Sequence, residues 1–472
     1  MSAGLHSKDK SRIMLTTPIP KLVLQMAYPT IIAFMITAIY SLTDTYFVSG
    51  LGINATAAVS VNTSLDQVIA MSGSMLGLGA NSMIARTLGG GKREKAEQLL
   101  STAFFLAFGF GLLLLLAGLP FLTPLMRFLG ATKSCERYSV DYATYVLLAA
   151  PFTAASTVMN QCLRSEGSAV RSMLGSGIGG ILNCILDPLL ITTCSLGVKG
   201  ASLATALSKF AGFCIFIYPY LTKKTYLRLS LKNFRPKLQT LLQIFNYGSS
   251  SMLRGGLAIV AGVVLNNLAG NISDAVLAGV GVANRVLMLP FNVILGFAAG
   301  FQPVAGYNWG SRRFDRVRES FRFASTTAFC GAAILGGLLA LLAPWVIRLF
   351  TKADAEATGI GILCIRLQCA AMPIHAYVAV VDTFCSGLGH AHGARFLATA
   401  RQGTAFFPVV YPMAYFWGAN GVAAAQAAAD ALTIVLSIPV LHHVRKMIQS
   451  AEQQSVHQCL SDPENTSMLN GN

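Results

Sequence analysis

The chain has 472 residues, of which 54% are hydrophobic and 11% charged; a soluble domain of ordinary composition carries about 25% charged residues. Its formal net charge is +16. Apolar runs near the spanning length of about 20 residues recur throughout, as at 99–122 and 331–350. Lipid leaves backbone groups without water, and these runs lack the alternation of barrel strands. The composition therefore excludes a soluble domain and predicts an all-α integral membrane protein.

About twelve transmembrane helices are expected in chain order. The predicted spans are 22–48, 55–84, 98–122, 139–163, 172–194, 200–221, 239–269, 275–303, 320–347, 357–388, 394–416 and 420–443. The N-terminus lacks the apolar region of a removable signal peptide. The predicted organisation is a cytoplasmic N-terminus (1–21), an N-terminal six-helix lobe (22–221), a cytoplasmic linker (222–238), a C-terminal six-helix lobe (239–447) and a polar, disordered tail (448–472).

The basic residues sort by side of the membrane. The termini and the even-numbered loops carry 25 Lys and Arg residues, whereas the odd-numbered loops carry 6. This bias predicts a multi-pass protein of the cell (plasma or inner) membrane with both termini in the cytoplasm. Because the basic residues do not cluster with aromatic ones, no nucleic-acid partner is expected. The ten cysteines form no C-x-x-C pair and are expected to be free.

The chain repeats itself at an offset of 221 residues. Gly89 falls on Gly310, and the loop GGGKREKAEQ then overlays GSRRFDRVRE. Six helices per half place both halves in the same orientation, so the repeats are expected to be parallel with a cleft between them. Further matches are Ala57, Val59, Val61, Gly79, Gly197 and Gly200 with Ala278, Val280, Val282, Gly300, Gly418 and Gly421.

Three polar residues of the first half have no counterpart in the second. Asp44 falls on Leu265, Asn183 on Thr404 and Asp187 on Pro408. An acid inside a span costs about 2.5–3.5 kcal/mol on insertion scales. Carboxylates needed only for the scaffold should recur in both halves. The N-terminal half is therefore predicted to carry a polar site that the fold does not require.

At these residues the chain resembles the multidrug and toxic compound extrusion (MATE) family, nearest its MepA-type branch. The resemblance covers about residues 15–447. It is carried by YPTIIAFMITAIYSLTDTYFVSGLGINATAAVS from Tyr28, LRSEGSAVRSM (163–173), NCILDPLL (183–190), GVKGASLATALS (197–208), AAGFQPVAGYNWGSRRFDRVRESF (298–321) and ARQGTAFFP (400–408).

The resemblance implies a secondary transporter that expels organic cations in exchange for Na⁺ or H⁺. It also implies a helix bend at Pro29 and a cation site in the N-terminal lobe. One branch of the family carries a glutamate in the seventh helix, where this chain has Arg254. That branch also has an aspartate in the tenth helix, and Asp382 of this chain lies about one turn from the matching place. The matching coupling and substrate positions are Tyr40, Asp44, Asn160, Asn183, Asp187 and Thr205.

The residues themselves support cation binding. Asn183 and Asp187 are spaced i, i+4 and so share a helix face. Their oxygens, with the Thr205 hydroxyl, suit Na⁺, and desolvated carboxylates also suit a proton. No other metal site is expected, since the histidines His375, His390 and His392 are predicted to lie near span ends or in a loop, solvated or hydrogen-bonded.

Other charged residues inside spans remain open to two interpretations. Asp66, Asp382 and Asp430 either contact substrate or reach an aqueous cleft. Arg254 either pairs with a helix carbonyl or carboxylate, which is the favoured interpretation, or binds substrate. GGGKR at Gly89 is no P-loop because no Ser or Thr follows Lys92. An ion gradient rather than ATP is therefore expected to drive transport.

The predicted function is a secondary antiporter that exports amphipathic, cationic organic compounds in exchange for Na⁺ or H⁺, without a further cofactor. The partners are small-molecule substrates and the lipid bilayer. The alternative is a flippase of lipid-linked precursors, which a multiply basic central cavity would favour. A membrane-embedded enzyme is the remote alternative and lacks a catalytic cluster. The sequence leaves the choice of coupling ion, the natural substrate and the oligomeric state open.

Overall fold

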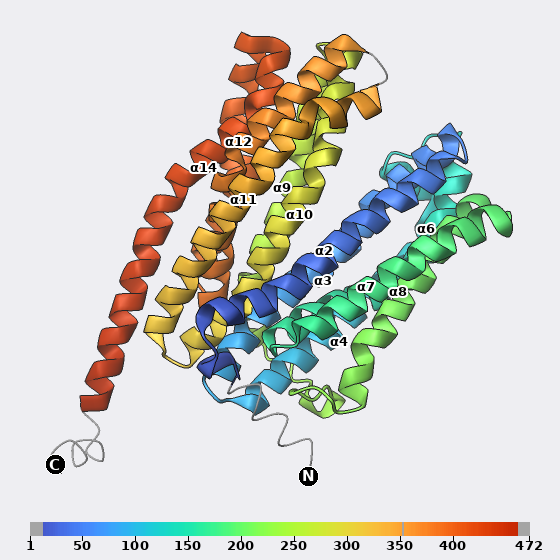
Figure 1. Ribbon diagram of the computed structural model, residues 1–472. Coiled ribbons are helices and arrows are strands. Elements are labelled where there is room, and N and C mark those ends of the chain that lie inside the picture. Colours follow the sequence, from blue (N-terminus) through green and yellow to red (C-terminus); the bar gives the residue numbers. More distant parts are fainter. Residues whose placement is uncertain (1–12, 352–353, 461–472) are drawn as a thin grey trace.

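A computed structural model describes residues 13–351 and 354–460, and within them the regular structure is entirely helical. Figure 1 shows two lobes, α2–α8 (blue to green) and α9–α14 (yellow to red). This confirms the expected all-α architecture. The N-terminal lobe contains α2 (Ile19–Ser49), α3 (Ile53–Gly89), α4 (Arg93–Gly118), α5 (Leu122–Phe128), α6 (Glu136–Ser165), α7 (Ala169–Pro188) and α8 (Gly197–Leu221). The C-terminal lobe contains α9 (Leu238–Gly270), α10 (Asp274–Gly310), α11 (Phe314–Thr351), α12 (Ala355–Leu388), α13 (Ala391–Thr399) and α14 (Phe406–Leu460).

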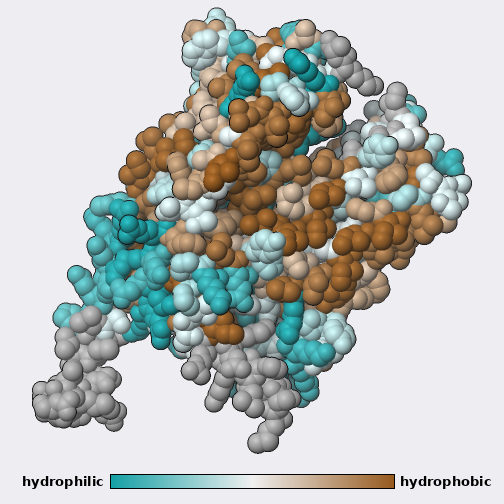
Figure 2. Space-filling model, in the orientation of Figure 1, coloured by the Kyte–Doolittle hydropathy of each residue, from teal (hydrophilic) through white to brown (hydrophobic). Residues whose placement is uncertain are grey.

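The last helical segment supplies two spans. Eleven described segments are long and apolar enough to cross a membrane, and the last of them is Ala391–Ser455. Gly418 interrupts α14 with φ +54° and ψ −129°, a conformation that a residue without Cβ adopts easily. Gly197, its counterpart in the first half, has φ +55°. The break at Gly418 therefore separates the eleventh span from the twelfth. Figure 2 shows a broad hydrophobic surface over both lobes and hydrophilic residues gathered near the lower end of α14.

The two halves repeat in three dimensions as well as in sequence. Helices α3 and α10 each have 37 residues, and they begin at Ile53 and Asp274. Between them, the Asn81 side chain donates to Gln302 over 3.5 Å, and these two residues are 221 positions apart. A hydrogen bond between equivalent residues places an approximate two-fold axis between α3 and α10.

Glycines bring the backbones of the two lobes together around this axis. A Cβ on Gly89 would lie 2.0 Å from the Tyr307 carbonyl oxygen, and one on Gly310 would lie 2.0 Å from that of Arg86. These two contacts are the same contact made twice. Lipid provides no hydrophobic force between helices, so close packing through small residues stabilises such an interface. In Figure 1 the lobes meet toward the lower end, where α3 and α10 end, and diverge toward the other end.

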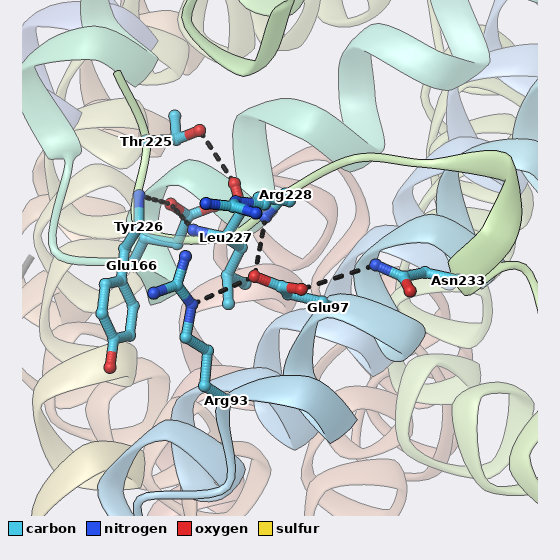
Figure 3. A network of polar contacts seen from close by, with 8 residues as sticks. All are labelled: Arg93, Glu97, Glu166, Thr225, Tyr226, Leu227, Arg228 and Asn233. Carbon is cyan, nitrogen blue, oxygen red and sulfur yellow. Dashed lines mark hydrogen bonds and ion pairs between the residues drawn. The ribbon is translucent and has the colours of Figure 1, made fainter. Parts of the chain in front are cut away.

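Two glutamates hold the linker between the lobes against the N-terminal lobe (Figure 3). Glu166 accepts the backbone N–H groups of Tyr226 and Leu227 over 3.1 and 3.3 Å. Glu97 accepts the N–H of Arg228 over 3.3 Å and the amide of Asn233 over 3.5 Å. The linker is thus held against the N-terminal lobe from Tyr226 to Asn233.

The prediction of a disordered tail over residues 448–472 is wrong for residues 448–460. Residues 448–460 continue α14, and Arg318 of α11 donates to both carboxylate oxygens of Glu452 over 2.8 and 2.9 Å. Glu, Gln and Ala propagate a helix that a neighbouring span has already nucleated. Ile448 is buried, which further anchors the extension. Residues 461–472 of the tail and residues 1–12 of the N-terminus lie outside the described chain.

Candidate functional site

The polar cluster of the N-terminal lobe centres on the end of α7. The Asn183 side-chain amide donates to Asp187 Oδ1 over 3.2 Å and approaches the Thr205 hydroxyl of α8 at 3.5 Å. Asn183 and Asp187 are 2% and 0% exposed. The i, i+4 spacing placed the first pair on one face, and the packing of α7 against α8 brings Thr205 to it. The structure thus brings together three of the residues selected from sequence.

Three buried oxygens of this region have no hydrogen-bond partner among the described residues. They are Asn183 Oδ1, Asp187 Oδ2 and Asp44 Oδ1. Asp44 is on α2, which packs against α7, the helix that carries Asn183 and Asp187. Buried polar atoms are normally satisfied, so unsatisfied acceptors call for a ligand that supplies positive charge or a proton. An all-oxygen donor set of two carboxylates and an amide fits a hard cation such as Na⁺, and also a proton.

A cavity of about 190 Å³ adjoins the cluster within the N-terminal lobe. Tyr40, Asn160, Asn183 and Thr205 line it. Asn160 is already engaged, because its amide donates to Ser176 over 3.1 Å and its oxygen accepts from Arg164 over 3.3 Å. Tyr40 and Asn160 therefore belong to the cavity wall, and Asn160 is held in place by its neighbours.

Lys209 is a charged residue of this cavity that the sequence did not single out as a site residue. Its ammonium pairs with Asp66 of α3, and their side chains are 17% and 34% exposed. The two residues are 143 positions apart, so no local pattern indicates the pair. The structure shows Asp66 paired with a lysine, a contact that neither of the two interpretations of this residue had named.

The acids of the C-terminal lobe are also paired. Arg254 of α9 lies 3.1 Å from Asp382 of α12, which agrees with the expected carboxylate partner. Arg401 binds Asp430 through two nitrogens at 2.6 and 3.3 Å. Neither acid is a solvated group at a cleft mouth, since Asp382 is 5% and Asp430 1% exposed.

The expectation for His375 is wrong. It lies well inside α12, is buried, and packs edge-on against the Phe291 ring at 5.1 Å between centroids. Its burial follows from the depth of α12 within the lobe, which hydropathy alone does not reveal. His390 does lie at a helix start, where its ring accepts the Gly393 N–H over 3.1 Å, and exposed His392 contacts Arg395. Within the described ranges, no three His, Cys, Asp or Glu side chains form a metal cluster.

Pro29 lies inside α2, which continues from Ile19 to Ser49. Proline lacks the N–H that would bond the carbonyl of Gln25 one turn earlier. The turn of α2 at Pro29 is therefore weakened, and it lies fifteen residues before Asp44 on the same helix. The bend itself stays a prediction.

A second cavity, of about 480 Å³, lies between the lobes. Phe34 and Met71 line it from the N-terminal lobe, and Phe291, Arg254 and Asp382 line it from the C-terminal lobe. A space shared by two mobile lobes can be exposed to either side of a membrane in turn. The fold and these cavities define a two-lobed membrane transporter built from parallel repeats.

The chain belongs to the MatE family, whose model matches residues 29–189 and 256–405. The multidrug export proteins MepA of Staphylococcus haemolyticus and Staphylococcus aureus are each 24% identical to it, over 91% of this chain and 94% and 95% of their own. Among solved structures, a MATE in complex with MaL6 has a TM-score of 0.88 at 26% identity, covering 93% of this chain and 99% of its own. A MOP superfamily transporter from Pyrococcus furiosus, described as having a binding pocket of reverse polarity, has a TM-score of 0.86 at 26% identity, with 93% and 98% covered.

Proposed function

We propose that this chain is a secondary antiporter that exports amphipathic organic cations in exchange for Na⁺ or H⁺. The observation that carries the proposal is the set of three unsatisfied oxygens on Asp44, Asn183 and Asp187 within the described chain. The named relatives support it, because they are multidrug export proteins of nearly the same length.

Antiport requires that ion and substrate favour different conformations or compete for one group. A charged carboxylate at Asp44 or Asp187 attracts an organic cation through the adjoining cavity. A bound Na⁺ or proton neutralises that charge and weakens the attraction. The weakened turn at Pro29 lets α2 respond to the change at Asp44. Entry of the coupling ion thereby releases the substrate.

The basic bias places both termini and the linker in the cytoplasm. The lobes then meet on the cytoplasmic side and the cavity between them faces outward. Lys232 is exposed in the linker, so a cysteine at this position, with the native cysteines replaced, should react with a membrane-impermeant maleimide only after the cells are permeabilised. Labelling in intact cells would reverse the orientation.

Transport in proteoliposomes tests the function directly. A fluorescent organic cation is loaded, and Na⁺ and pH gradients are imposed separately. We expect efflux with one gradient and none after that gradient is collapsed by an ionophore. Equal efflux without any gradient, or none under either, would contradict ion-coupled export.

A further inference from the structure

The cavity between the lobes differs in charge from the N-terminal cluster. Its wall contains two guanidinium groups, Arg254 and Arg401, but one carboxylate, Asp382. Asp430, which binds Arg401, is 1% exposed and is not among the residues that line the wall. The lining thus presents two guanidiniums and one carboxylate, whose Oδ1 has no hydrogen-bond partner among the described residues.

Arg254 has hydrogen-bonding capacity that its protein partner does not use. A guanidinium carries five N–H donors in a planar fork. In the described chain its ion pair is the single contact to Asp382 Oδ2 at 3.1 Å, and one third (33%) of the side chain is exposed. The remaining donors point to an acceptor outside the protein.

Arg401 lines the same cavity as Arg254 and is held by two neighbouring side chains. Two of its nitrogens bind Asp430, and its guanidinium lies 5.0 Å from the centre of the Phe291 ring. A guanidinium fixed on both sides loses little further freedom when it binds an anion with its remaining donors. Arg401, held in this way, and the less constrained Arg254 line the same cavity wall, and two guanidiniums suit a carboxylate or phosphate group.

A neutral donor adds to this wall. Gln302 Nε2 is buried without a partner among the described residues, and Gln302 itself is 2% exposed and lines the cavity. The Gln302 side-chain oxygen already accepts a hydrogen bond from Asn81. What Gln302 offers to a ligand is therefore its side-chain N–H donor. An unsatisfied buried donor favours an acceptor ligand.

The repeat shows that the scaffold does not require these cations. At the offset of 221, Arg254 corresponds to Ala33 and Arg401 to Gly180. The N-terminal lobe folds with small residues at both positions. The repeated scaffold itself therefore does not require these guanidiniums, and their N–H groups beyond the two ion pairs are available to a ligand.

We propose that the C-terminal wall of this cavity is an anion subsite, formed by Arg254, Arg401 and Gln302, which binds the carboxylate or phosphate of amphiphiles that carry such a group besides their cationic one. The proposal rests on the export function above and extends its substrate class from cations to zwitterions. Arg254 and Arg401 bind the anionic group, while the apolar wall at Phe34 and Met71 takes the body of the molecule.

A matched pair of dyes tests the subsite. One rhodamine carries a free benzoate, and the other is its methyl ester, which is purely cationic. In gradient-driven proteoliposome efflux, Arg254→Gln should lower transport of the acid about tenfold, as expected for one lost charge-assisted hydrogen bond, and leave the ester within about twofold. Arg254→Lys should recover part of the acid transport because it keeps the charge.

A double variant separates binding from folding. Arg254→Gln with Asp382→Asn removes both charges of the pair, so no unpaired carboxylate remains, and it should show the same selective loss. A parallel fall of acid and ester in both variants would overturn the subsite. Wild-type transport of the ester with no transport of the acid or of an anionic lipid would also overturn it while leaving the export function intact, whereas failure to move either dye would reject the export function itself.

An anionic lipid headgroup offers the same chemistry. Translocation of fluorescent phosphatidylglycerol in the same vesicles distinguishes this source. Lipid movement that Arg254→Gln abolishes would support the subsite with a lipid as its ligand. Movement of neither the acid dye nor the lipid, with active ester export, would refute it.

Discussion

The two lobes share a scaffold but differ in how they hold buried acids. In the N-terminal lobe, Asp44 and Asp187 have no arginine or lysine partner, and each keeps a carboxylate oxygen without a hydrogen bond among the described residues. In the C-terminal lobe, Asp382 and Asp430 are each paired with an arginine, although Asp382 Oδ1 also lacks a hydrogen-bond partner there. Lys209 carries a positive charge, whereas its counterpart at the offset of 221, Asp430, is an acid. Since one backbone accommodates both arrangements, charge is not what builds the lobe.

The difference separates two roles for a buried acid. A buried carboxylate without a partner raises the free energy of the folded protein, and a ligand that binds it lowers that free energy again. A paired one has its partner inside the protein, and removing either member leaves an uncompensated charge. Neutralising Asp44 or Asp187 should therefore impair transport, whereas neutralising Asp430, which binds Arg401 through both oxygens, should impair folding.

The largest effect is expected from Asp187→Asn and Asp44→Asn. Asparagine keeps the size and removes the charge, so both variants should insert normally and lose gradient-driven export down to the level of empty vesicles. Efflux of a fluorescent cation, normalised to purified protein, is the measurement. Intact coupling in both variants would place the coupling site elsewhere.

Asp430→Asn should act on stability instead. It leaves the partly buried Arg401, whose side chain is 20% exposed, without its carboxylate. Breaking a buried ion pair costs up to about 3–5 kcal/mol. The melting temperature in detergent and the yield of folded protein should fall. Arg401→Gln added to this variant should restore much of both, because the charge left behind is removed. A stable single variant would show that the lobes do not differ in this respect.

The glycine contacts test how far the two halves are equivalent. Gly89→Ala and Gly310→Ala each push a methyl group against a carbonyl of the other lobe, at a cost of about 1–3 kcal/mol for overpacking. Both should lower the melting temperature by similar amounts. Gly109→Ala is the matched control, since nothing lies within 4 Å of a Cβ there. Unequal effects of the first two would break the symmetry of the interface.

The smallest effect is expected from Asp66→Asn. Its pair with Lys209 is partly exposed, and such pairs contribute about 0–1 kcal/mol. Export should change by less than about fivefold. A loss as complete as that of Asp187→Asn would move Asp66 into the coupling site.

Much of this fold could be predicted from the sequence because bilayer thickness and lipid solvation act on local stretches of chain. The i, i+4 spacing of Asn183 and Asp187 was equally local. The pairs Lys209–Asp66 and Arg401–Asp430 join residues from different helices, and hydropathy carries no information about which spans face each other. Likewise, the burial of His375 depends on how α12 packs within its lobe.

The attachment of the linker has a consequence for stoichiometry. An interface made of the same contact twice, at Gly89 and Gly310, is nearly self-complementary, so isolated lobes of one kind can pair with their own copies. Glu97 and Glu166 fix the linker as far as Asn233, which leaves a short tether to the start of α9 at Leu238. Such a short tether keeps the local concentration of the unlike lobe far above that of any lobe on another molecule. The N-terminal lobe of each chain therefore pairs with the C-terminal lobe of the same chain rather than with a like lobe of another molecule.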